Sequence, residues 1–505
     1  MPNQSQISTW LRKNGPTLTR ELISALTKTE GISAGTARKR IQRAREEYKC
    51  FEGVNFEKNA QFIYLENQYG TRQFWEKFEE ACYRGGKSYW NTIVTLKSRG
   101  GVIPFSLFPR VSGAAVMRKS QLSPQEILDR LSGIGLLEIF EETENKCIRF
   151  KPRFYPRIPL SHMRANELAE KIALLGVKDW ARKIGFGSYN KFGVRYEPET
   201  VVSGISWDLS APSYIRPLLS FRNDAPLPGF IVCDINLTCR VIEENEAEAF
   251  IRKCNLATST QEARPILPMM LGYHFTREAL SLLKGKGILA VVLKDFFGDE
   301  LSEALQDLVK MLTDIGERIS VNPDRLIAVM DNLSKIEGAA NNLRGDLFEL
   351  IMGMLAKDIE VGDLKTGELR RDPITGRSVE IDVQIDRGYD KGILVIECKA
   401  KNSRAMVSEN DIRKWYKDRV PLIFSILNND QKSAKKPIHF ELWSNGQFVN
   451  SGSSWLRQQK TNLEKYTVGW KDGEKLKAYA RKANNYRLRK MLNEHYFKSA
   501  TGKSL

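Results

Sequence analysis

The segment from residue 380 to residue 401, EIDVQIDRGYDKGILVIECKAK, constrains the fold more than any other part of the chain. Its apolar run at residues 393–396 is typical of a β-strand that is buried on both faces of a sheet. This run leads directly into Glu397 and Lys399, and a preceding extended run carries Asp382. We therefore expect two carboxylates and one lysine at the ends of adjacent strands.

Such a group of side chains suits a hard divalent cation and a water molecule. Mg²⁺ prefers oxygen ligands, keeps several waters and is usually held by one or two carboxylates. A metal on Asp382 and Glu397 would polarise a phosphate oxygen and lower the pKa of a bound water. Lys399 would then hydrogen-bond that water or the oxygens of the transition state. Cys398 lies on the other face of the strand, because side chains alternate, and is expected to be a small core residue.

The pattern resembles the PD-(D/E)xK nuclease superfamily, which includes many restriction endonucleases. The resemblance implies that Asp382 and Glu397 bind metal and that Lys399 positions or activates the attacking water. It also implies Mg²⁺ as the cofactor, with Mn²⁺ as a substitute. The sequence departs from the motif at one position, because Ile381 stands where the motif has proline.

The string acid-x-lysine is not specific by itself, since Glu47, Glu144 and Asp430 also begin one. Only the copy at Glu397 follows a continuous apolar strand and has a partner acid before it. The alternative interpretation is an amphipathic hairpin whose charged residues lie at its solvent end.

The residues around this segment are consistent with an α/β core. Residues 342–357 have helical apolar spacing and contain Glu349. Family members often open the core with a helix whose glutamate faces the metal, so Glu349 is a candidate metal ligand; the alternative places it on the solvated face. Residues 409–426 predict a helix that runs into a strand or loop, and residues 438–443 a further strand. The resulting order of helix, hairpin, strand, helix and strand matches the superfamily.

Charge and cysteine content narrow the partners and the compartment. The net charge of +17 and the pI near 9.4 predict a polyanionic partner. No long apolar span or signal-peptide core is present, so we expect no membrane partner and a cytoplasmic location. The seven cysteines are scattered and indicate neither a disulfide framework nor a zinc ribbon.

The N-terminal residues predict a DNA-binding unit. Residues 18–26 form one expected helix, and Ser33 precedes a second one with a basic face. Residues 50–66 are expected to form a β-wing, so the unit resembles a winged helix, in which the second helix enters the major groove. The alternative is that this basic face is only solvated. The candidate DNA-binding residues of the chain are Arg38, Lys39, Arg40, Arg43 and Lys87.

Similar patterns follow up to residue 150. Residues 71–82 and 88–97 predict two helices joined by a loop with Lys87, and residues 102–111 are strand-like. A capping-box pattern at Ser123 begins another helix, followed by two strands. We therefore expect three helix–helix–wing units in tandem.

The middle of the chain has an α/β pattern. Residues 229–237 predict a buried strand, and residues 273–292 predict a helix followed by a strand, which resembles the end of Mrr-like restriction-enzyme cores. This implies a degenerate nuclease-like fold with a structural or DNA-positioning role, in which Asp208 is a relic of the first acid. A generic α/β interdomain module is the alternative. The basic residues near the C-terminus predict either a phosphate-binding helix or a solvated one.

The predicted fold class is a multidomain α/β and α+β protein with tandem winged helices and a C-terminal restriction-endonuclease-like core. The expected segments are a winged helix (1–68), further winged-helix-like units (69–150), an α/β domain (151–300), a helical linker (301–341), the nuclease domain (342–450) and a basic segment (451–505).

The predicted function is that of a Mg²⁺-dependent, type II-like restriction endodeoxyribonuclease that acts on double-stranded DNA. The separation of a DNA-recognition region from the cleavage domain resembles the arrangement of type IIS restriction enzymes or of modification-dependent type IV defence nucleases. One site cuts one strand, so double-strand cleavage requires a homodimer or sequential nicking. A non-catalytic DNA-binding regulator and an RNA-processing nuclease are the alternatives.

Overall fold

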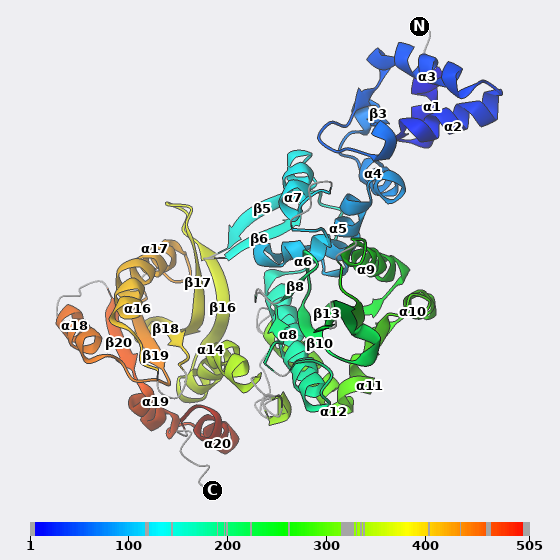
Figure 1. The fold of residues 1–505 in the computed structure, drawn as a ribbon. Coiled ribbons are helices and arrows are strands. Elements are labelled where there is room, and N and C mark those ends of the chain that lie inside the picture. Colours follow the sequence, from blue (N-terminus) through cyan, green and yellow to red (C-terminus); the bar gives the residue numbers. More distant parts are fainter. Residues whose placement is uncertain are drawn as a thin grey trace. The chain divides into compact units, whose positions relative to one another are not determined.

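The chain divides into two compact units. A computed structural model describes residues 6–116, 121–142, 145–188, 190–195, 197, 200–222, 225–260, 263–314, 328–329, 331–333, 336, 339–401, 405–434, 436–460 and 466–497. The first unit comprises Met1–Met163 and Trp180–Phe296, and the second comprises Arg164–Asp179 and Phe297–Leu505. Mixed helices and sheets make up both units (Figure 1). The predicted six-segment division is finer than this and stays a prediction.

The N-terminal part of the first unit repeats one order of elements: helix, strand, helix, helix, strand, strand. The first run consists of α1 (Gln6–Asn14), β1 (Thr17–Leu18), α2 (Thr19–Glu30), α3 (Ala34–Arg43), β2 (Lys49–Cys50) and β3 (Phe62–Tyr64). After α4 (Arg72–Gly85), the second run consists of α5 (Lys87–Ser98), β4 (Val102–Pro104), α6 (Phe108–Ser112), α7 (Pro124–Gly133), β5 (Leu137–Glu142) and β6 (Asn145–Phe150). The strand orders β1-β3-β2 and β4-β6-β5 correspond, because the last strand is central in each.

These elements confirm most of the expected helices and change their grouping. Ser33 caps α3, and Ser123 forms a capping box with Glu126 at the start of α7. The described residues of this region form two three-stranded sheets, however, so the expectation of three wings was wrong. Residues 102–111 were expected to be extended, yet α6 begins at Phe108. Pro109 lies in its first turn, where the missing N–H of proline costs nothing.

A five-stranded sheet forms the rest of the first unit. Its order is β15-β14-β13-β10-β7, and the long strand β13 (Gly229–Ile242) is central. The expected strand at 229–237 and the helix–strand pair at 273–292 are confirmed. Other elements of this part are β7 (Gly193–Val194), β10 (Leu209–Ser213), α9 (Glu244–Ala257), β14 (Ile266–Phe275), α10 (Arg277–Lys284) and β15 (Leu289–Val292).

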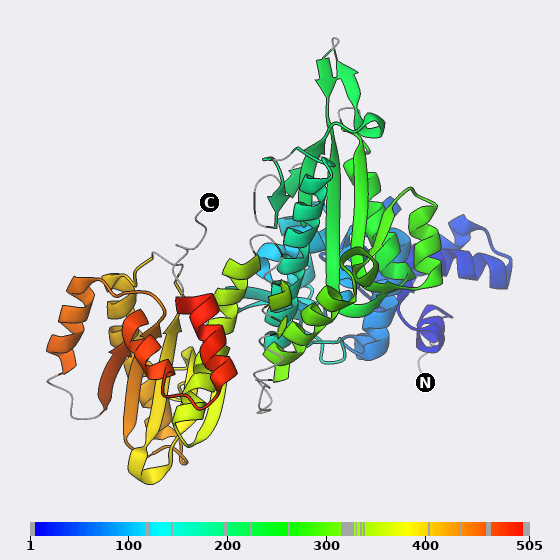
Figure 2. The same ribbon diagram turned by 90° about the horizontal axis from the view of Figure 1, so that it is seen from below.

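Smaller elements accompany this sheet. The hairpin of β11 (Ser220–Arg222) and β12 (Ala225–Leu227) projects beyond one end of the sheet (Figure 2). The others are β8 (Val201–Val202), β9 (Ile205–Ser206) and α11 (Leu293–Phe297). Most of the long helix α8 (Leu160–Lys183) and all of α12 (Asp299–Asp314) belong to the second unit. The predicted helical linker at 301–341 is therefore helical to Asp314, and most of its remainder lies outside the described residues.

A second five-stranded sheet, in the order β16-β17-β18-β19-β20, is the centre of the second unit. The strands are β16 (Asp363–Arg371), β17 (Ser378–Asp386), β18 (Ile393–Lys399), β19 (Ile438–Ser444) and β20 (Thr467–Lys471). The helices are α14 (Ala339–Ile359), α15 (Gly388–Lys391), α16 (Glu409–Lys414), the π-helical turn η8 (Trp415–Arg419), α17 (Val420–Asn429), α18 (Asn450–Lys460), α19 (Gly473–Ala480) and α20 (Tyr486–Leu492). The predicted order of helix, hairpin, strand, helix and strand is confirmed. Residues 409–426 were expected to run from a helix into a strand or loop, and this was wrong, because the segment stays helical to Asn429.

One strand of the predicted C-terminal basic segment belongs to this second sheet. Strand β20 pairs with β19 beyond the predicted domain end at residue 450. The basic stretch near the C-terminus is broken into α19 and α20. Tyr479 of α19 makes an edge-to-face contact with Trp443, with ring centroids 5.1 Å apart, whereas Tyr486 is exposed.

Both five-stranded sheets have the same topology. In each, the first two pairings along the sheet, β7–β10 and β10–β13 or β16–β17 and β17–β18, are antiparallel. The next two, β13–β14 and β14–β15 or β18–β19 and β19–β20, are parallel. In each sheet, helices form both parallel connections, because parallel neighbours need a crossover.

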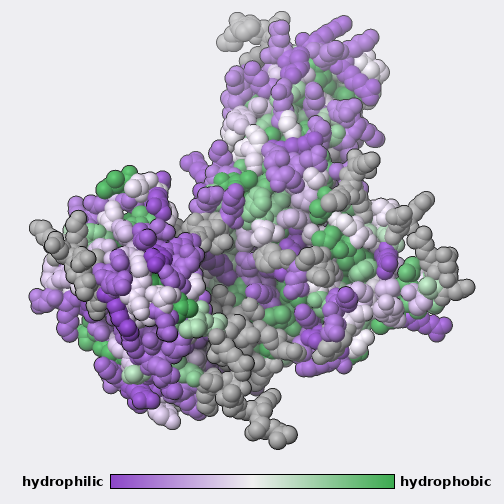
Figure 3. All heavy atoms as spheres, turned by 60° about the vertical axis from the view of Figure 1, so that its left-hand side comes forward, coloured by the Kyte–Doolittle hydropathy of each residue, from purple (hydrophilic) through white to green (hydrophobic). Residues whose placement is uncertain are grey.

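No helix among the described residues is long and apolar enough to cross a membrane. Hydrophilic side chains dominate the face drawn in Figure 3, and hydrophobic ones form small scattered groups.

Gly392 is a strict requirement of the hairpin that leads into β18. Its φ is +68°, and a Cβ atom there would lie 1.9 Å from the carbonyl oxygen of Pro437. We predict that Gly392→Ala lowers the free energy of unfolding by about 2–4 kcal/mol, measured by urea denaturation.

Gly388 provides the matched control, because its φ is +87° and nothing lies within 4 Å of the added Cβ. Gly388→Ala should cost only about 1 kcal/mol. Equal losses of unfolding free energy in the two variants would show that the clash with Pro437 does not destabilise the fold.

Candidate active site

Asp382 and Glu397 lie side by side on the two central antiparallel strands of the second unit. Val383 of β17 pairs with Ile396 of β18, so the next residue outward on each strand places Asp382 opposite Glu397. Glu397 is 3% exposed and Asp382 is 7% exposed. The backbone N–H of Cys398 donates to Oδ2 of Asp382 at 2.8 Å, which fixes the orientation of that carboxylate. Cys398 itself is buried, as predicted.

Two cations neutralise the carboxylate pair. Nζ of Lys399 lies 2.8 Å from Oε1 of Glu397, and Nε of Arg419 lies 2.8 Å from Oε2. Nη2 of Arg419 also contacts Oδ1 of Asp382 at 3.3 Å and donates to the carbonyl oxygen of Glu380 at 2.7 Å. Arg419 therefore bridges both acids, while Lys399, which is half-buried, serves only Glu397.

The surroundings of Asp382 disfavour its negative charge. Burial raises the pKa of Asp382 well above its usual range, and the neighbouring Glu397 and Glu349 raise it further. Burial would lower the pKa of Lys399, but the Glu397 carboxylate outweighs it and the net shift is upward. The surroundings of Lys399 therefore favour its protonated form.

Glu349 of α14 belongs to the same electrostatic group. Burial raises its pKa to about 7, and the charges of Glu380 and Glu397 add to this effect. Helix α14 packs against β16, β17 and β18, which brings its glutamate to the strand that carries Glu397. Glu349 therefore lies close enough to Glu397 for their charges to interact, and its role as a metal ligand stays a prediction.

A divalent metal is compatible with this donor set, although the structure does not establish a metal centre. Both acids offer hard oxygen ligands, and within the part of the chain that the structure describes Oε1 of Glu397 is buried without an aligned hydrogen-bond donor. However, among the described residues no group of three or more His, Cys, Asp or Glu side chains is arranged to hold a metal ion. Ligation by Asp382, Glu397 and Glu349 stays a prediction, and Arg419 would have to yield oxygen atoms to an incoming cation.

The predicted DNA-binding residues differ in their surroundings. Arg38, Lys39 and Arg43 are exposed on α3, while Ala37 and Ile41 of the same helix are buried. Arg40 instead pairs with Glu30 and donates to Oε1 of Gln6 at 3.0 Å, so it serves the fold of the unit.

Lys87 is exposed at the first residue of α5. Most of that helix is buried, however, including Tyr89, Trp90 and Ile93. Helix α5 therefore belongs to the core of the first unit and does not present a basic face as α3 does.

Arg419 is the site residue that sequence reasoning missed. It ends the π-helical turn η8, twenty-two residues after Glu397 in the chain and adjacent to it in space. A weak signal was present in Pro421, because a proline inside a helical pattern distorts the preceding turn. π-Helical turns are frequent at functional sites.

Comparisons with known proteins add little to this geometry. No family model and no curated protein matches the chain. One solved structure, titled "MspJI Restriction Endonuclease in Complex with 27-mer Oligonucleotide", aligns with a TM-score of 0.19 and 14% identity. The alignment covers 43% of this chain and 49% of that one, about half its length. A TM-score this low does not establish a shared fold.

The raised pKa of Glu349 predicts a pH-dependent stability. Its carboxyl holds a proton up to about pH 7 in the folded chain, against 4.5 for the ordinary group. The folded state therefore binds more protons between these values, and stability falls as pH rises through them. We predict that, as pH rises from 4.5 to 7.5, the free energy of unfolding of Glu349→Gln rises relative to that of wild type by up to about 3 kcal/mol. The measurement is urea unfolding of both proteins in EDTA. A constant difference across this range would contradict the burial of the charge.

Proposed function

We propose that this chain is a metal-dependent DNA endonuclease of the PD-(D/E)xK type, with Asp382, Glu397 and Lys399 as its catalytic residues. The observation that carries the proposal is the buried acid pair on adjacent strands, with a protonated lysine two residues after the second acid. Burying two adjacent carboxylates is costly, and a pair of this kind with a lysine at its rim is the arrangement that suits metal-dependent hydrolysis of a phosphodiester. The alternative of a hairpin with solvated charged residues does not agree with their burial.

The arrangement suits hydrolysis of a phosphodiester. Mg²⁺ or Mn²⁺, when bound to the two carboxylates, would supply charge neutralisation and a more acidic water. Lys399 lies at the rim of the pair, 35% exposed, and its ammonium can donate to a phosphate oxygen or to the attacking water. Arg419 keeps the two acids in register by contacting both of them. Glu349 would add a third carboxylate to this negative site when it loses its proton on cation binding.

DNA recognition is the proposed role of the first unit. The order of α1, β1, α2, α3, β2 and β3 supports a winged helix in which α3 is the recognition helix. Three exposed cations on α3, Arg38, Lys39 and Arg43, suit phosphate or base contacts. The second run of elements would be a further winged helix whose equivalent helix is α7. Its charged residues include Glu126 and Asp129, so it is a poorer DNA contact than α3.

A single proposed active site per chain restricts the products. One site hydrolyses one strand, so cleavage of both strands needs a homodimer on the DNA or two successive nicks. A supercoiled plasmid separates these outcomes, because nicking gives an open-circular intermediate before the linear form.

The catalytic role of Lys399 is tested by Lys399→Ala. We predict that cleavage of duplex DNA in Mg²⁺ falls at least about 100-fold, because a donor to the transition state is lost. DNA affinity should change little. The measurement is single-turnover cleavage of methylated and unmethylated genomic DNA, with binding followed separately by gel shift.

Lys401→Ala is the matched control. Lys401 lies two residues further along the chain but pairs with Asp411 at 3.3 Å, away from the acid pair. Its variant should retain cleavage. Binding without cleavage in every metal and on every DNA would favour a non-catalytic regulator, and preferential cleavage of structured RNA would favour an RNA-processing nuclease.

The proposed contact between α3 and DNA is tested by replacing its exposed cations. The triple variant Arg38→Ala, Lys39→Ala and Arg43→Ala should bind DNA more weakly, and its dependence of log affinity on log salt should be shallower by about 1–3. Arg40→Ala should instead lower stability and leave that slope unchanged, since Arg40 is paired inside the unit. Equal slopes in wild type and triple variant would exclude α3 as a DNA contact.

A further inference from the structure

The shared topology of the two five-stranded sheets extends to their acidic residues. In the first unit Leu209 of β10 pairs with Cys233 of β13. Continuing that antiparallel register by one residue places Asp208 opposite Asp234, as Asp382 lies opposite Glu397 in the second unit. The two sheets therefore carry a carboxylate pair at the same position of the same strand pairing.

The hydrogen bonds around the pairs also correspond. The N–H of Ile235, which follows Asp234, donates to Oδ2 of Asp208 at 3.1 Å. In the second unit the N–H of Cys398, which follows Glu397, donates to Oδ2 of Asp382. The correspondence thus holds for individual atoms, and it goes beyond the order of the strands.

The helical connection after each second acid contributes a cation. Lys253 of α9, the helix between β13 and β14, pairs with Oδ2 of Asp234. Arg419, from the connection between β18 and β19, pairs with Glu397. Lys253 is therefore the counterpart of Arg419.

The two pairs differ at the position of Lys399. Two residues after Asp234 the chain has Asn236, which donates to Oγ of Ser98 at 2.9 Å. Ser98 is the last residue of α5. The position that holds a rim cation in the second unit instead binds a neighbouring helix in the first.

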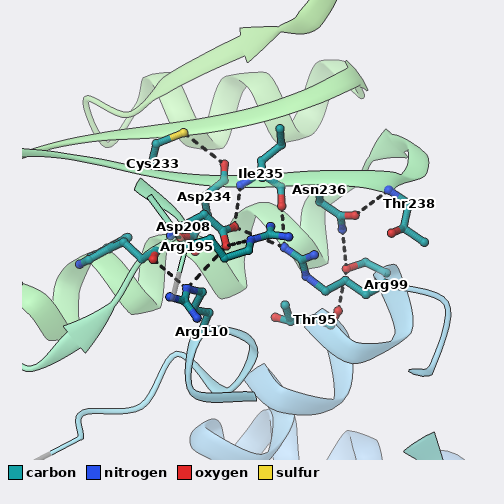
Figure 4. Close-up of polar contacts among 12 residues, drawn as sticks. Thr95, Arg99, Arg110, Arg195, Asp208, Cys233, Asp234, Ile235, Asn236 and Thr238 are labelled. Carbon is teal, nitrogen blue, oxygen red and sulfur yellow. Dashed lines mark hydrogen bonds and ion pairs between the residues drawn. The ribbon is translucent and has the colours of Figure 1, made fainter. Parts of the chain in front are cut away.

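Three buried arginines meet Asp208. Arg195 contacts Oδ1 at 2.9 Å, Arg110 contacts it at 3.7 Å, and Arg99 contacts Oδ2 at 3.5 Å. Figure 4 shows the three guanidinium groups converging on this carboxylate, with α5 and the following loop next to the sheet. Arg110 also donates to the carbonyl oxygen of Trp207 at 2.8 Å, which joins α6 to the chain just before β10.

The two acid pairs differ in the number of cations that neutralise them. Within the described residues, Asp208 and Asp234 together pair with four cations (Arg99, Arg110, Arg195 and Lys253), whereas Asp382 and Glu397 pair with two (Lys399 and Arg419). A divalent cation that approached Asp208 and Asp234 would be repelled by these four positive charges. The pocket beside Asp234 is also walled by Asn91, Thr95 and Ser98 of α5.

We propose that the sheet of the first unit is a second copy of the C-terminal core, whose acid pair has become an anchor for α5 and α6 in place of a metal site. The comparison with a metal site rests on the proposed function of the second unit. The anchor fixes the helices of the N-terminal region to the middle sheet. The chain then has one competent site and one blocked site.

The first test compares Asp208→Asn with Asp382→Asn in the full chain by thermal unfolding in EDTA. Asp208→Asn leaves three buried arginines without their shared carboxylate, so we expect its first melting temperature to fall by roughly 5 °C or more. Asp382→Asn removes a charge beside two other carboxylates and should leave the melting temperature unchanged or higher. Equal behaviour of the two variants would overturn the anchor.

A milder variant keeps the test decisive if Asp208→Asn does not fold. Asn236→Ala removes only the bond to Ser98, and hydrogen exchange of the α5 amides should become at least about 10-fold faster, while exchange in α14 stays unchanged. Unchanged exchange in α5 would contradict the anchor.

The second test measures Mn²⁺ binding by equilibrium dialysis, at a temperature where every variant is folded. Asp208→Asn should bind as much Mn²⁺ as wild type, and Asp382→Asn should lose it. Loss of Mn²⁺ in Asp208→Asn would overturn the proposal, since the first pair would then be a metal site. Absence of Mn²⁺ from wild type would count against the proposed nuclease, and the unfolding contrast would still decide whether Asp208 is an anchor.

Discussion

The pairing of β17 with β18 is the constraint on which the candidate active site depends. This antiparallel register puts Asp382 and Glu397 on neighbouring strands with their side chains adjacent. Two carboxylates at such close range, both buried, cannot both be charged without compensation. The rest of the site follows from this requirement: Lys399 from the same strand and Arg419 from the next helical connection supply the positive charge.

The same constraint has two different outcomes within one chain. Asp208 and Asp234 take the equivalent positions in the first unit, with the same backbone hydrogen bond between the strands. Their neighbours are different, because arginines from α6 and from the residues after α5 and β7 reach Asp208. We infer that the charge of the surroundings, rather than the acids themselves, separates the proposed metal site from the proposed anchor.

Prediction from the sequence succeeded where the pattern was local. The apolar run at 393–396 indicated β18, and alternation along the strand put Cys398 in the core. Helical spacing indicated α14, and the family resemblance made its Glu349 a candidate for the site. Prediction failed where the grouping was non-local: two sheets form in the N-terminal region where three wings were expected, because β4 pairs with β6 rather than closing a unit of its own.

The sequence by itself determined the acids, the lysine and the strand that carries them, since strand periodicity and spacing act over a few residues. Only the tertiary structure decided which cations neutralise them. Arg419 lies twenty-two residues from Glu397 in the chain, and Arg99 lies more than a hundred residues from Asp208, so no local pattern connects these partners. Burial favours such pairings, because a carboxylate removed from water must be neutralised by a proton or by a cation that the fold brings to it.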